Sequence, residues 1–142
     1  MKLREIMTPN PVHVEPDTTV DVAARLLTQY NIGMLPVCTP DGALHGLVTD
    51  RDIVTRCLAA GRSPAHTGVR DVMTRRIVSA PPHMETSAAA HLMGREQIRR
   101  LPILEDGRLQ GIVSLGDLAE WEESSLDASD ALTEISTNLS RR

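Results

Sequence analysis

The sequence predicts a mixed α/β (α+β) fold in which two units of strand, helix, strand, strand and helix pack sheet on sheet into one domain. Three observations lead to this prediction. A segment occurs twice along the 142 residues, each copy has two short apolar runs joined by Asp-Gly, and 41% of the residues are hydrophobic. Because a unit of about 55 residues can hardly bury a core by itself, the two units are expected to share one.

The duplication shows as a nearly constant shift in residue number. Ile6-Met7-Thr8 returns as Val72-Met73-Thr74, and Leu35-Pro36-Val37 returns as Leu101-Pro102-Ile103, both 66 positions later. The second copy then lacks one residue, so the Asp-Gly pair that begins at 41 returns at 106, which is 65 positions later. A constant shift over so long a stretch marks an internal repeat.

Each copy begins with an extended stretch and a helix. The stretches 12–14 and 78–80 are followed by prolines, which cannot continue a central strand. In the first copy Thr18 precedes Asp21 as in a capping box, and apolar residues then recur at intervals of three and four, which predicts a helix. The second copy shows the same apolar face, although Gly94 is expected to weaken its helix.

Each copy ends with a hairpin and a second helix. Apolar runs flank Asp41-Gly42 and Asp106-Gly107, and Asp-Gly between apolar runs predicts a β-hairpin. Each hairpin leads into a helix, the first expected from Asp50 to about residue 60 and the second from Leu115 to about residue 122.

These elements divide the chain into a first repeat at 3–60, a linker at 61–68, a second repeat at 69–122 and a tail at 123–142. The tail is open to two interpretations. Leu132, Ile135 and Leu139 have helical spacing, which favours a short amphipathic helix for packing or dimerisation. Serine and charged residues are abundant in the same stretch, which is equally typical of a frayed terminus.

Composition excludes several classes of function. The formal net charge is −4, and the chain has one Trp, one Tyr and no Phe. A nucleic-acid partner is therefore not expected, because such proteins neutralise phosphates with basic residues and stack bases on aromatic rings. No stretch approaches the roughly 18 apolar residues of a membrane span, so we expect no membrane association and a cytoplasmic protein.

Cysteine and histidine give no catalytic or metal-binding pattern. Cys38 and Cys57 are too few for a disulfide framework and are expected to be reduced, partly buried apolar residues, with a bridge or redox switch as the alternative. The five histidines are dispersed without metal-ligand spacing, which leaves open only a zinc site assembled in three dimensions. Because no nucleophile is accompanied by a base, we predict neither an enzyme nor a required cofactor.

The residues most suggestive of function lie where a strand becomes a helix. The pattern of Gly, two apolar residues, Ser or Thr, two residues and Asp occurs at 46–52 and again at 111–117. A hydroxyl at a helix start can donate to a phosphate oxygen, and an aspartate one turn later can accept both hydroxyls of a ribose. The same pattern is equally typical of a capping box with a purely structural role.

The two junctions differ in their neighbours. Thr49 and Asp52 flank Arg51, so this junction is the more fully equipped one, whereas Ser114 and Asp117 flank Leu115-Gly116. We expect the second junction to take positive charge from Arg99 or Arg100, because guanidinium groups match phosphate oxygens. Each arginine could instead be solvated or contact a second copy of the chain. The two sites are therefore expected to be unequal.

The doubled unit resembles a known family. Met7-Thr8-Pro9 opens the first copy, Leu-Pro precedes each hairpin, and the junction motif closes both copies. In this the chain resembles a tandem pair of CBS (cystathionine-β-synthase) domains, a Bateman module of the stand-alone bacterial type, over about residues 3 to 122. One departure is that the second copy opens with Met73-Thr74-Arg75 and lacks the proline.

The resemblance implies β-α-β-β-α repeats with pseudo-two-fold symmetry, a homodimer, and clefts between the repeats that bind AMP, ADP, ATP or S-adenosylmethionine. Because the chain has only one Trp and one Tyr, adenine would lie among the aliphatic side chains of the two extended stretches and be recognised by backbone groups. The candidate ligand-binding residues are Val12, His13, Val14, Met34, Pro36, Thr49, Arg51 and Asp52 in the first copy and Val78, Ser79, Ala80, Arg99, Arg100, Pro102, Ser114 and Asp117 in the second.

The function implied is a regulatory module that senses adenine nucleotides or related adenosine compounds and acts on a regulated protein that the sequence does not identify. The alternative is an interaction or stress-response scaffold with vestigial clefts and no nucleotide ligand. Binding of an adenosine compound distinguishes the two.

Overall fold

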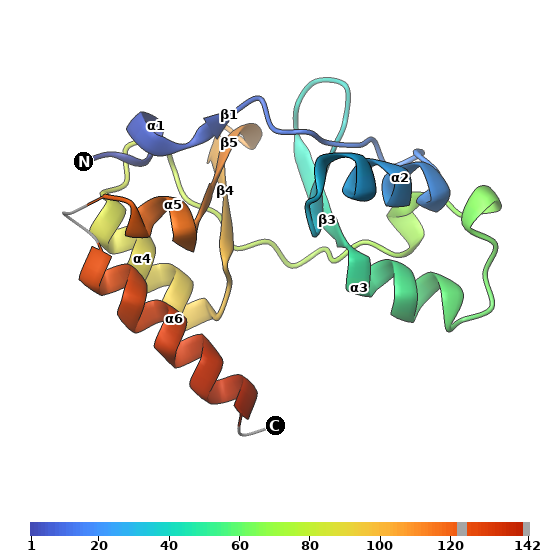
Figure 1. Cartoon of the computed structure of the whole chain (residues 1–142). Helices are drawn as coiled ribbons and strands as arrows, with labels where there is room; N and C mark the ends of the chain where they lie inside the picture. Colours follow the sequence, from blue (N-terminus) through green and yellow to red (C-terminus); the bar gives the residue numbers. More distant parts are fainter. Residues whose placement is uncertain (122–124, 141–142) are drawn as a thin grey trace. The chain divides into compact units, whose positions relative to one another are not determined.

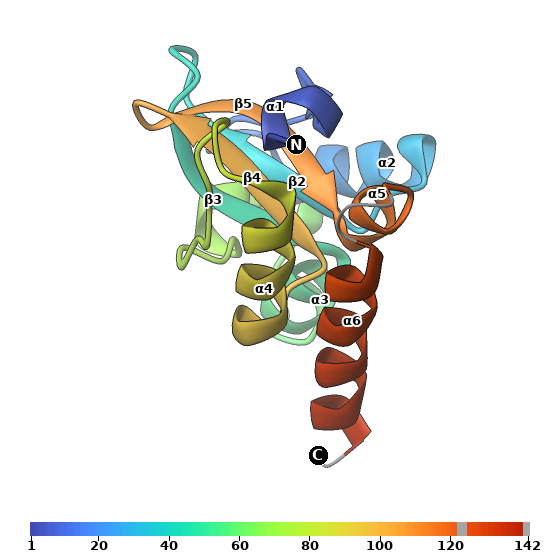
Figure 2. The same cartoon turned by 90° about the vertical axis from the view of Figure 1, so that its left-hand side faces the viewer.

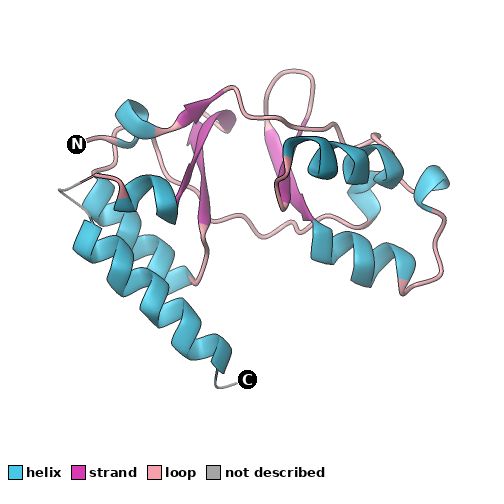
Figure 3. Ribbon diagram, viewed as in Figure 1, coloured by secondary structure: helices cyan, strands magenta, loops and turns pink. Residues whose placement is uncertain are grey.

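A computed structural model of the chain describes residues 1–121 and 125–140, and the side chains of all of these except 125–129 and 138–140. The predicted mixed α+β fold is confirmed. The described residues form two small sheets, of strand order β1-β5-β4 and β2-β3, together with their helices (Figures 1 and 3). Among the described residues, no helix has the length and apolar character needed to span a membrane.

The chain divides into two compact units. Residues 12–77 form one, called here the central unit, and residues 1–11 together with 78–142 form the other, called the terminal unit. Each unit has a core of its own, made of aliphatic side chains, so the expectation of one shared core was wrong. The units do not coincide with the sequence repeats, because the first residues of each repeat are incorporated into the unit built mainly from the other repeat.

The central unit follows the predicted order. An extended stretch, tied by a parallel bridge between Val14 and Val37, precedes helix α2 (Val20–Tyr30) and the hairpin of β2 (Met34–Cys38) and β3 (Leu44–Thr49). Helix α3 (Asp50–Asp52) continues as a π-helix (Ile53–Leu58), and two 3₁₀ turns follow at Pro64–His66 and Val69–Asp71. The alternation of buried and exposed residues along β3 shows that one face of this hairpin covers the core.

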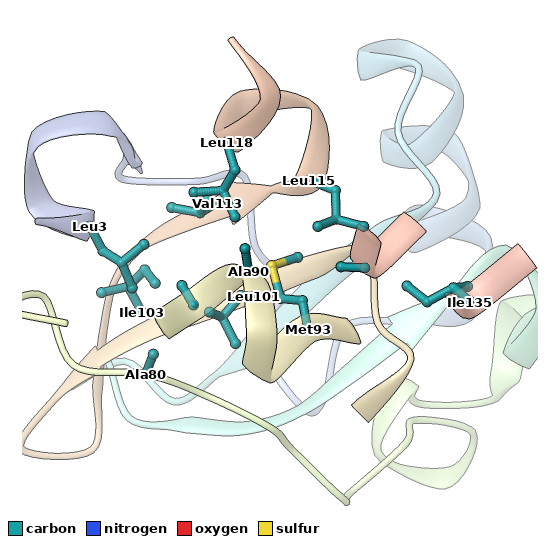
Figure 4. Close-up of a cluster of buried hydrophobic side chains, with 12 residues drawn as sticks. Leu3, Ala80, Ala90, Met93, Leu101, Ile103, Val113, Leu115, Leu118 and Ile135 are labelled. Carbon is teal, nitrogen blue, oxygen red and sulfur yellow. The ribbon is translucent and has the colours of Figure 1, made fainter. Parts of the chain in front are cut away.

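The terminal unit repeats this order. A parallel bridge between Ala80 and Ile103 precedes α4 (Thr86–Glu96), the strands β4 (Arg100–Glu105) and β5 (Arg108–Ser114), and helix α5 (Leu115–Ala119). Helix α1 (Leu3–Ile6) and strand β1 (Thr8–Pro9) come from the N-terminal end of the chain, and α6 (Ser125–Ser140) from the other end. Figure 4 shows the shared core, in which Leu3, Leu101, Val113 and Ile135 come from four different elements.

The hairpin of the terminal unit has a tight turn. Glu105 pairs with Arg108, and the two residues of the turn, Asp106 and Gly107, both have positive φ (53° and 77°). Positive φ at both central residues is the geometry that matches the twist of antiparallel strands, and Asp-Gly adopts it readily. The predicted hairpin, and with it the register of β4 against β5, follows from these two residues.

Two local predictions were wrong. Thr19 rather than Thr18 stands at the N-cap position of α2, and neither side chain caps the helix. The Thr18 hydroxyl instead accepts a hydrogen bond from the Glu15 amide (3.1 Å) and so closes the preceding turn. The helix expected to reach about residue 122 ends at Ala119, directly after Leu118, which is the last buried residue of α5. Residue 122 lies outside the described residues. In both places a short local turn ended or delayed the helix.

The opening residues of the two repeats are exchanged between the units. Thr8 and Pro9 in β1 pair with Ile112 and Gly111 of β5, which belongs to the second repeat. In the central unit, the Leu47 and Thr74 backbones exchange hydrogen bonds of 2.9 and 2.7 Å. The same supersecondary contact is therefore formed twice, each time by residues from both repeats.

The repeated glycine of the junction motif makes this exchange possible. A Cβ atom on Gly46 would lie 2.8 Å from the Thr74 carbonyl oxygen, and one on Gly111 would lie 2.7 Å from the carbonyl oxygen of Thr8. Real Cβ atoms do not come so close to a backbone oxygen. Glycine is required at these positions because another backbone lies against the strand.

The C-terminal tail forms a helix of sixteen residues that packs in the terminal unit. Figures 1 and 2 both show α6 running beside α4. Ala131 and Ile135 are buried, and a Cβ atom on Gly94 of α4 would lie 2.9 Å from the Ala131 Cβ. Gly94 therefore has a packing role, which the expectation of a weakened helix did not include. The side chain of Leu139 is outside the described residues.

Candidate functional site

The junction of β3 and α3 in the central unit has the geometry of a capping box. The Thr49 hydroxyl accepts a hydrogen bond from the Asp52 amide, and the Asp52 carboxylate accepts one from the Thr49 amide, both at 3.0 Å. The hydroxyl and the carboxylate thus both satisfy backbone donors at the start of the helix. In this respect the structural interpretation of the motif is correct.

Asp52 has further partners that draw it into the core. The residue is 6% exposed, and both of its carboxylate oxygens lie 3.2 Å from the Thr74 hydroxyl. Arg56 Nε lies 3.8 Å from Oδ1, and the Arg56 guanidinium also donates to the Met73 carbonyl (3.0 Å). Asp52 therefore fastens the exchanged segment around Thr74 to the helix, and its oxygens are already engaged by protein donors.

The amides of the same helix turn are also engaged. The Asp50 amide donates to the Gly33 carbonyl (3.2 Å), and the Arg51 amide donates to the Asp50 carboxylate (2.8 Å). With the Asp52 amide on Thr49, all three donors at this helix start have acceptors. The Asp50 carboxylate adds a negative charge there, which opposes the binding of a phosphate.

The junction of β5 and α5 in the terminal unit has the same box but fewer other contacts. The Asp117 carboxylate accepts from the Ser114 amide (2.9 Å), and the Asp117 amide donates to the Ser114 hydroxyl (3.0 Å). The Leu115 amide donates to the Arg99 carbonyl (3.0 Å). Asp117 is half-buried, and within the described part of the chain the Gly116 amide has no acceptor.

A pocket of about 390 Å³ opens at this second junction. Arg100 is the cross-strand partner of Ser114, so the Cβ atoms of these residues are neighbours on the hairpin. Arg99 and Arg100 are both exposed, and no acidic side chain of the described residues forms an ion pair with either. The residues that line the pocket are Arg99, Arg100, Ser114, Leu115, Gly116 and Leu132.

This pocket combines two guanidinium groups with a hydroxyl and a backbone amide. Such a set of donors suits an oxyanion, and guanidinium groups bind phosphate through paired hydrogen bonds. At the corresponding position of the central unit Met34 lies opposite Thr49, and Gly33 precedes it, so this hairpin offers no cation there. Arg51, on the exposed side of α3, is the cation that the sequence placed at that junction.

The two predicted extended stretches lie beside β2 and β4, and the last residue of each is committed to the fold. Val14 donates its amide to the Pro36 carbonyl (3.0 Å) and accepts from the Cys38 amide (2.8 Å). Ala80 makes the equivalent bonds to Pro102 and Leu104 (3.1 and 2.9 Å). Val14, Ala80 and both prolines are also buried, so they position the neighbouring Val12, His13, Val78 and Ser79, which are half-buried or exposed.

The sequence reasoning missed three residues at the two junctions. Thr74 belongs to the repeated Met-Thr pair, so the repeat carried a signal for it that was not linked to Asp52. The Gly116 amide follows from comparing the junctions, because Gly116 replaces Arg51. Leu132 carried no such signal, because its place at the pocket depends on how α6 packs.

The described residues contain no group of three His, Cys, Asp or Glu side chains arranged to hold a metal ion. Cys38 and Cys57 are free thiols, and both are buried. Burial raises the pKa of the Cys38 thiol to about 11, which keeps it in the unreactive protonated form.

The duplicated unit, the exchanged opening segments and the two capped junctions define a tandem repeat protein, and comparison with known proteins gives its family. The family model of the CBS domain matches residues 3–59 and 69–124. The chain therefore belongs to the CBS domain family and contains two copies of the domain, as the sequence motifs indicated.

Relatives of similar length match most of the chain. The chain is 44% identical over 134 residues to the CBS domain-containing protein YhcV of Bacillus subtilis, with 94% of each chain covered. It is 34% identical over 116 residues to hypoxic response protein 1 of Mycobacterium tuberculosis, covering 82% of this chain and 81% of that protein.

Solved structures agree with the fold and include ligand complexes. A crystal structure of hypoxic response protein I with two coordinated zinc ions has a TM-score of 0.78 at 33% identity and covers 84% of this chain and 98% of that one. CBSX2 in complex with AMP gives 0.74 at 31% identity, with 84% and 93% covered. The CBS domain pair of MJ0100 in complex with 5′-methylthioadenosine and S-adenosyl-L-methionine gives 0.73 at 26%, with 84% and 94% covered.

Proposed function

We propose that this protein is a regulatory module that binds an adenosine phosphate at the junction of β5 and α5 in the terminal unit. The observation that carries the proposal is the pocket lined by Arg99, Arg100, Ser114 and Gly116. Its relatives CBSX2 and MJ0100 have been crystallised with AMP and with methylthioadenosine and S-adenosylmethionine, which supports the choice of an adenosine compound.

The donors of the pocket define what the phosphate would contact. The two guanidinium groups supply the positive charge, and the Ser114 hydroxyl and Gly116 amide supply two shorter-range donors. Hydrogen bonds between charged partners are roughly twice as strong as neutral ones, so the arginines account for most of the affinity. AMP, ADP and ATP therefore fit the pocket better than S-adenosylmethionine, which has no phosphate.

The nucleoside would extend from the pocket toward groups of the same unit. Asp117 is half-buried with one protein donor on its carboxylate, which leaves oxygens to accept ribose hydroxyls. Val78 and Ser79 precede the buried Ala80 and would contact the adenine with aliphatic surface and backbone groups. This assignment keeps the ligand on residues that the fold leaves available.

At the central junction we propose weak phosphate binding or none. Thr49, Asp50 and Asp52 satisfy one another and the helix amides, and Asp52 is buried beneath Thr74. Met34 lies opposite Thr49, and together with Arg51, Val12 and His13 it would remain to bind a nucleoside that lacks phosphate. The protein would act by binding rather than by turnover, as a cytoplasmic homodimer that signals occupancy to a regulated protein.

Isothermal titration with AMP, ADP, ATP and S-adenosylmethionine tests the proposal. We expect at least one of the three nucleotides to bind, and Arg99→Ala with Arg100→Ala to weaken that binding about a hundredfold or more, because each of the two lost charge-assisted bonds costs about 1.5–3 kcal/mol. Arg108→Ala is the matched control, because Arg108 is an exposed arginine of β5 outside the pocket.

The outcomes separate the two functions that the sequence left open. Nucleotide binding that depends on Arg99 and Arg100 supports the proposal. Failure of all four compounds to bind at millimolar concentration would favour a scaffold with vestigial sites. Binding that is equally strong in the double variant would place the ligand elsewhere and contradict the assignment of the pocket.

A further inference from the structure

Helix α6 lies outside the residues that the CBS domain model matches. The two matches to the CBS domain end at residue 59 and at residue 124, before α6 begins at Ser125. In the terminal unit α6 packs on both α4 and α5. In the described part of the central unit no helix packs on α2 in the way that α6 packs on α4. The terminal unit, which has the candidate pocket, is thus also the unit that carries this additional helix.

The docking of α6 depends on one close crossing. Gly94 of α4 lies so near Ala131 that a Cβ atom on Gly94 would come within 2.9 Å of the Ala131 Cβ and 3.0 Å of its Cα. One turn further along α6, Ile135 is 5% exposed and joins the core shown in Figure 4. Two contacts therefore hold α6 in place: Ala131 packs closely against Gly94, and Ile135 is buried in the core.

The residue that follows Ala131 faces the pocket. Leu132 lines it together with Arg99, Arg100, Ser114, Leu115 and Gly116. The residue is 39% exposed, although its side chain is large and apolar. An apolar side chain beside cationic donors excludes water from them, and charge interactions gain strength where water is excluded. Leu132 would cover part of an anion seated on the arginines.

We infer that α6 forms a wall of the phosphate pocket through Leu132, and that docking of α6 on α4 is coupled to binding of the nucleotide. This inference rests on the proposed function, and it concerns how nucleotide binding at that pocket is coupled to the position of α6. A ligand that contacts Leu132 binds the docked state more tightly, and by thermodynamic linkage it stabilises docking by the same factor. Occupancy of the pocket is thereby transmitted to the C-terminal helix, whose outer surface is available to a partner.

The test compares AMP affinity in two α6 variants with matched controls. Leu132→Ala removes the wall, and Gly94→Val displaces α6 because the new side chain cannot fit against Ala131. We expect each to weaken AMP binding about fivefold or more, which is the lower end of typical coupling between sites. Thr133→Ala, on the neighbouring exposed position, and Ala88→Val, on an exposed position of α4, should bind AMP as the unmodified chain does.

Hydrogen exchange of the amides at 130–137 supplies a second measurement. AMP should slow their exchange in the unmodified chain and in the controls, and the slowing should be lost in Leu132→Ala. If the unmodified chain binds AMP but neither variant changes its affinity, or AMP leaves exchange at 130–137 unchanged, the inference is overturned and the proposed function stands. If the unmodified chain binds no nucleotide at all, both are wrong.

Discussion

The two strand-to-helix junctions have the same motif and the same capping geometry, yet they differ in what surrounds the aspartate. Asp52 is buried and accepts hydrogen bonds from Thr74 as well as from the helix. Asp117 is half-buried, and Thr8, which corresponds to Thr74, is exposed on β1. Within the described residues, only the first aspartate fastens an exchanged segment. One motif thus supports an anchor in one unit and leaves donors available in the other.

The shared motif of Ser or Thr followed by Asp is therefore not enough to assign a ligand site. Both copies fold into capping boxes, which accounts for the hydroxyl and the aspartate without any ligand. They are distinguished by the residues inside the box, Asp50-Arg51 against Leu115-Gly116, and by the residue pair where each hairpin begins, Gly33-Met34 against Arg99-Arg100. The cations lie with the less occupied aspartate, and this coincidence supports a single phosphate site.

The largest effect is expected from removing the two aspartates. Asp52→Ala leaves the Thr49 amide and the Thr74 hydroxyl without their acceptor, so it should lower the free energy of unfolding by about 2–3 kcal/mol. Asp117→Ala removes one helix cap and should cost about 1 kcal/mol. Urea unfolding measures both losses.

The chain carries separate reporters for the two units. Both cysteines lie in the central unit, and Trp121, the one tryptophan of the chain, lies in the terminal unit. Asp52→Ala should therefore accelerate thiol labelling while leaving the fluorescence of Trp121 unchanged. Equal losses of stability in the two variants would contradict the different roles assigned to the two aspartates.

The next effect concerns affinity and comes from exchanging the residues that face each hydroxyl. Arg100→Met gives the terminal hairpin the residue found in the central one, and it should weaken AMP binding about tenfold, because one charge-assisted hydrogen bond is lost. Met34→Arg in the central unit should not create a site of equal strength, because Asp50 still occupies the Arg51 amide. Calorimetric stoichiometry checks this, and a second strong site in Met34→Arg would show that the cation alone decides binding.

Much of this comparison could be predicted from the sequence, because it depends on local pattern. Asp-Gly set the hairpins and hence the pairing of Arg100 with Ser114, so that the expected supply of charge to the second junction has a structural basis. Whether this pocket binds a ligand remains a prediction. The order of strands and helices followed from apolar periodicity in the same way.

The parts that sequence reasoning missed depend on contacts between distant segments. The burial of Asp52 requires Thr74, 22 positions away, to return to Leu47, and nothing local to either residue indicates that contact. The role of Gly94 requires knowledge of where Ala131 packs. From the sequence, Gly94 was expected only to weaken its helix, because glycine has a low helix propensity. In the fold, Gly94 makes room for α6.

A smaller effect is expected from acid, which should weaken the ion pairs that hold the N-terminal segment in the terminal unit. In the terminal unit Lys2 and the terminal amine pair with Glu85, at 2.7 and 2.9 Å, and these cations lower the pKa of the Glu85 carboxyl from 4.5 to about 2. A lowered pKa gives stability that is present above pH 4.5 and is lost as pH falls toward 2. The pair is half-exposed, so salt should weaken it. Glu85→Gln should remove this part of the acid response, as measured by hydrogen exchange at residues 1–6, and an unchanged acid response would contradict the assignment.

The smallest expected effect is the near absence of thiol chemistry in the folded central unit. Cys57 is fully buried, and burial raises the Cys38 pKa to about 11, so at pH 8 neither thiol should react with a disulfide reagent until the unit opens. The labelling rate then measures opening of the central unit alone, because the terminal unit has no cysteine.

If AMP binds only in the terminal unit, saturating AMP should slow exchange around α6 and leave the labelling rate of Cys38 and Cys57 unchanged. A labelling rate that falls with AMP would place a ligand contact in the central unit and contradict the proposal of a single phosphate site.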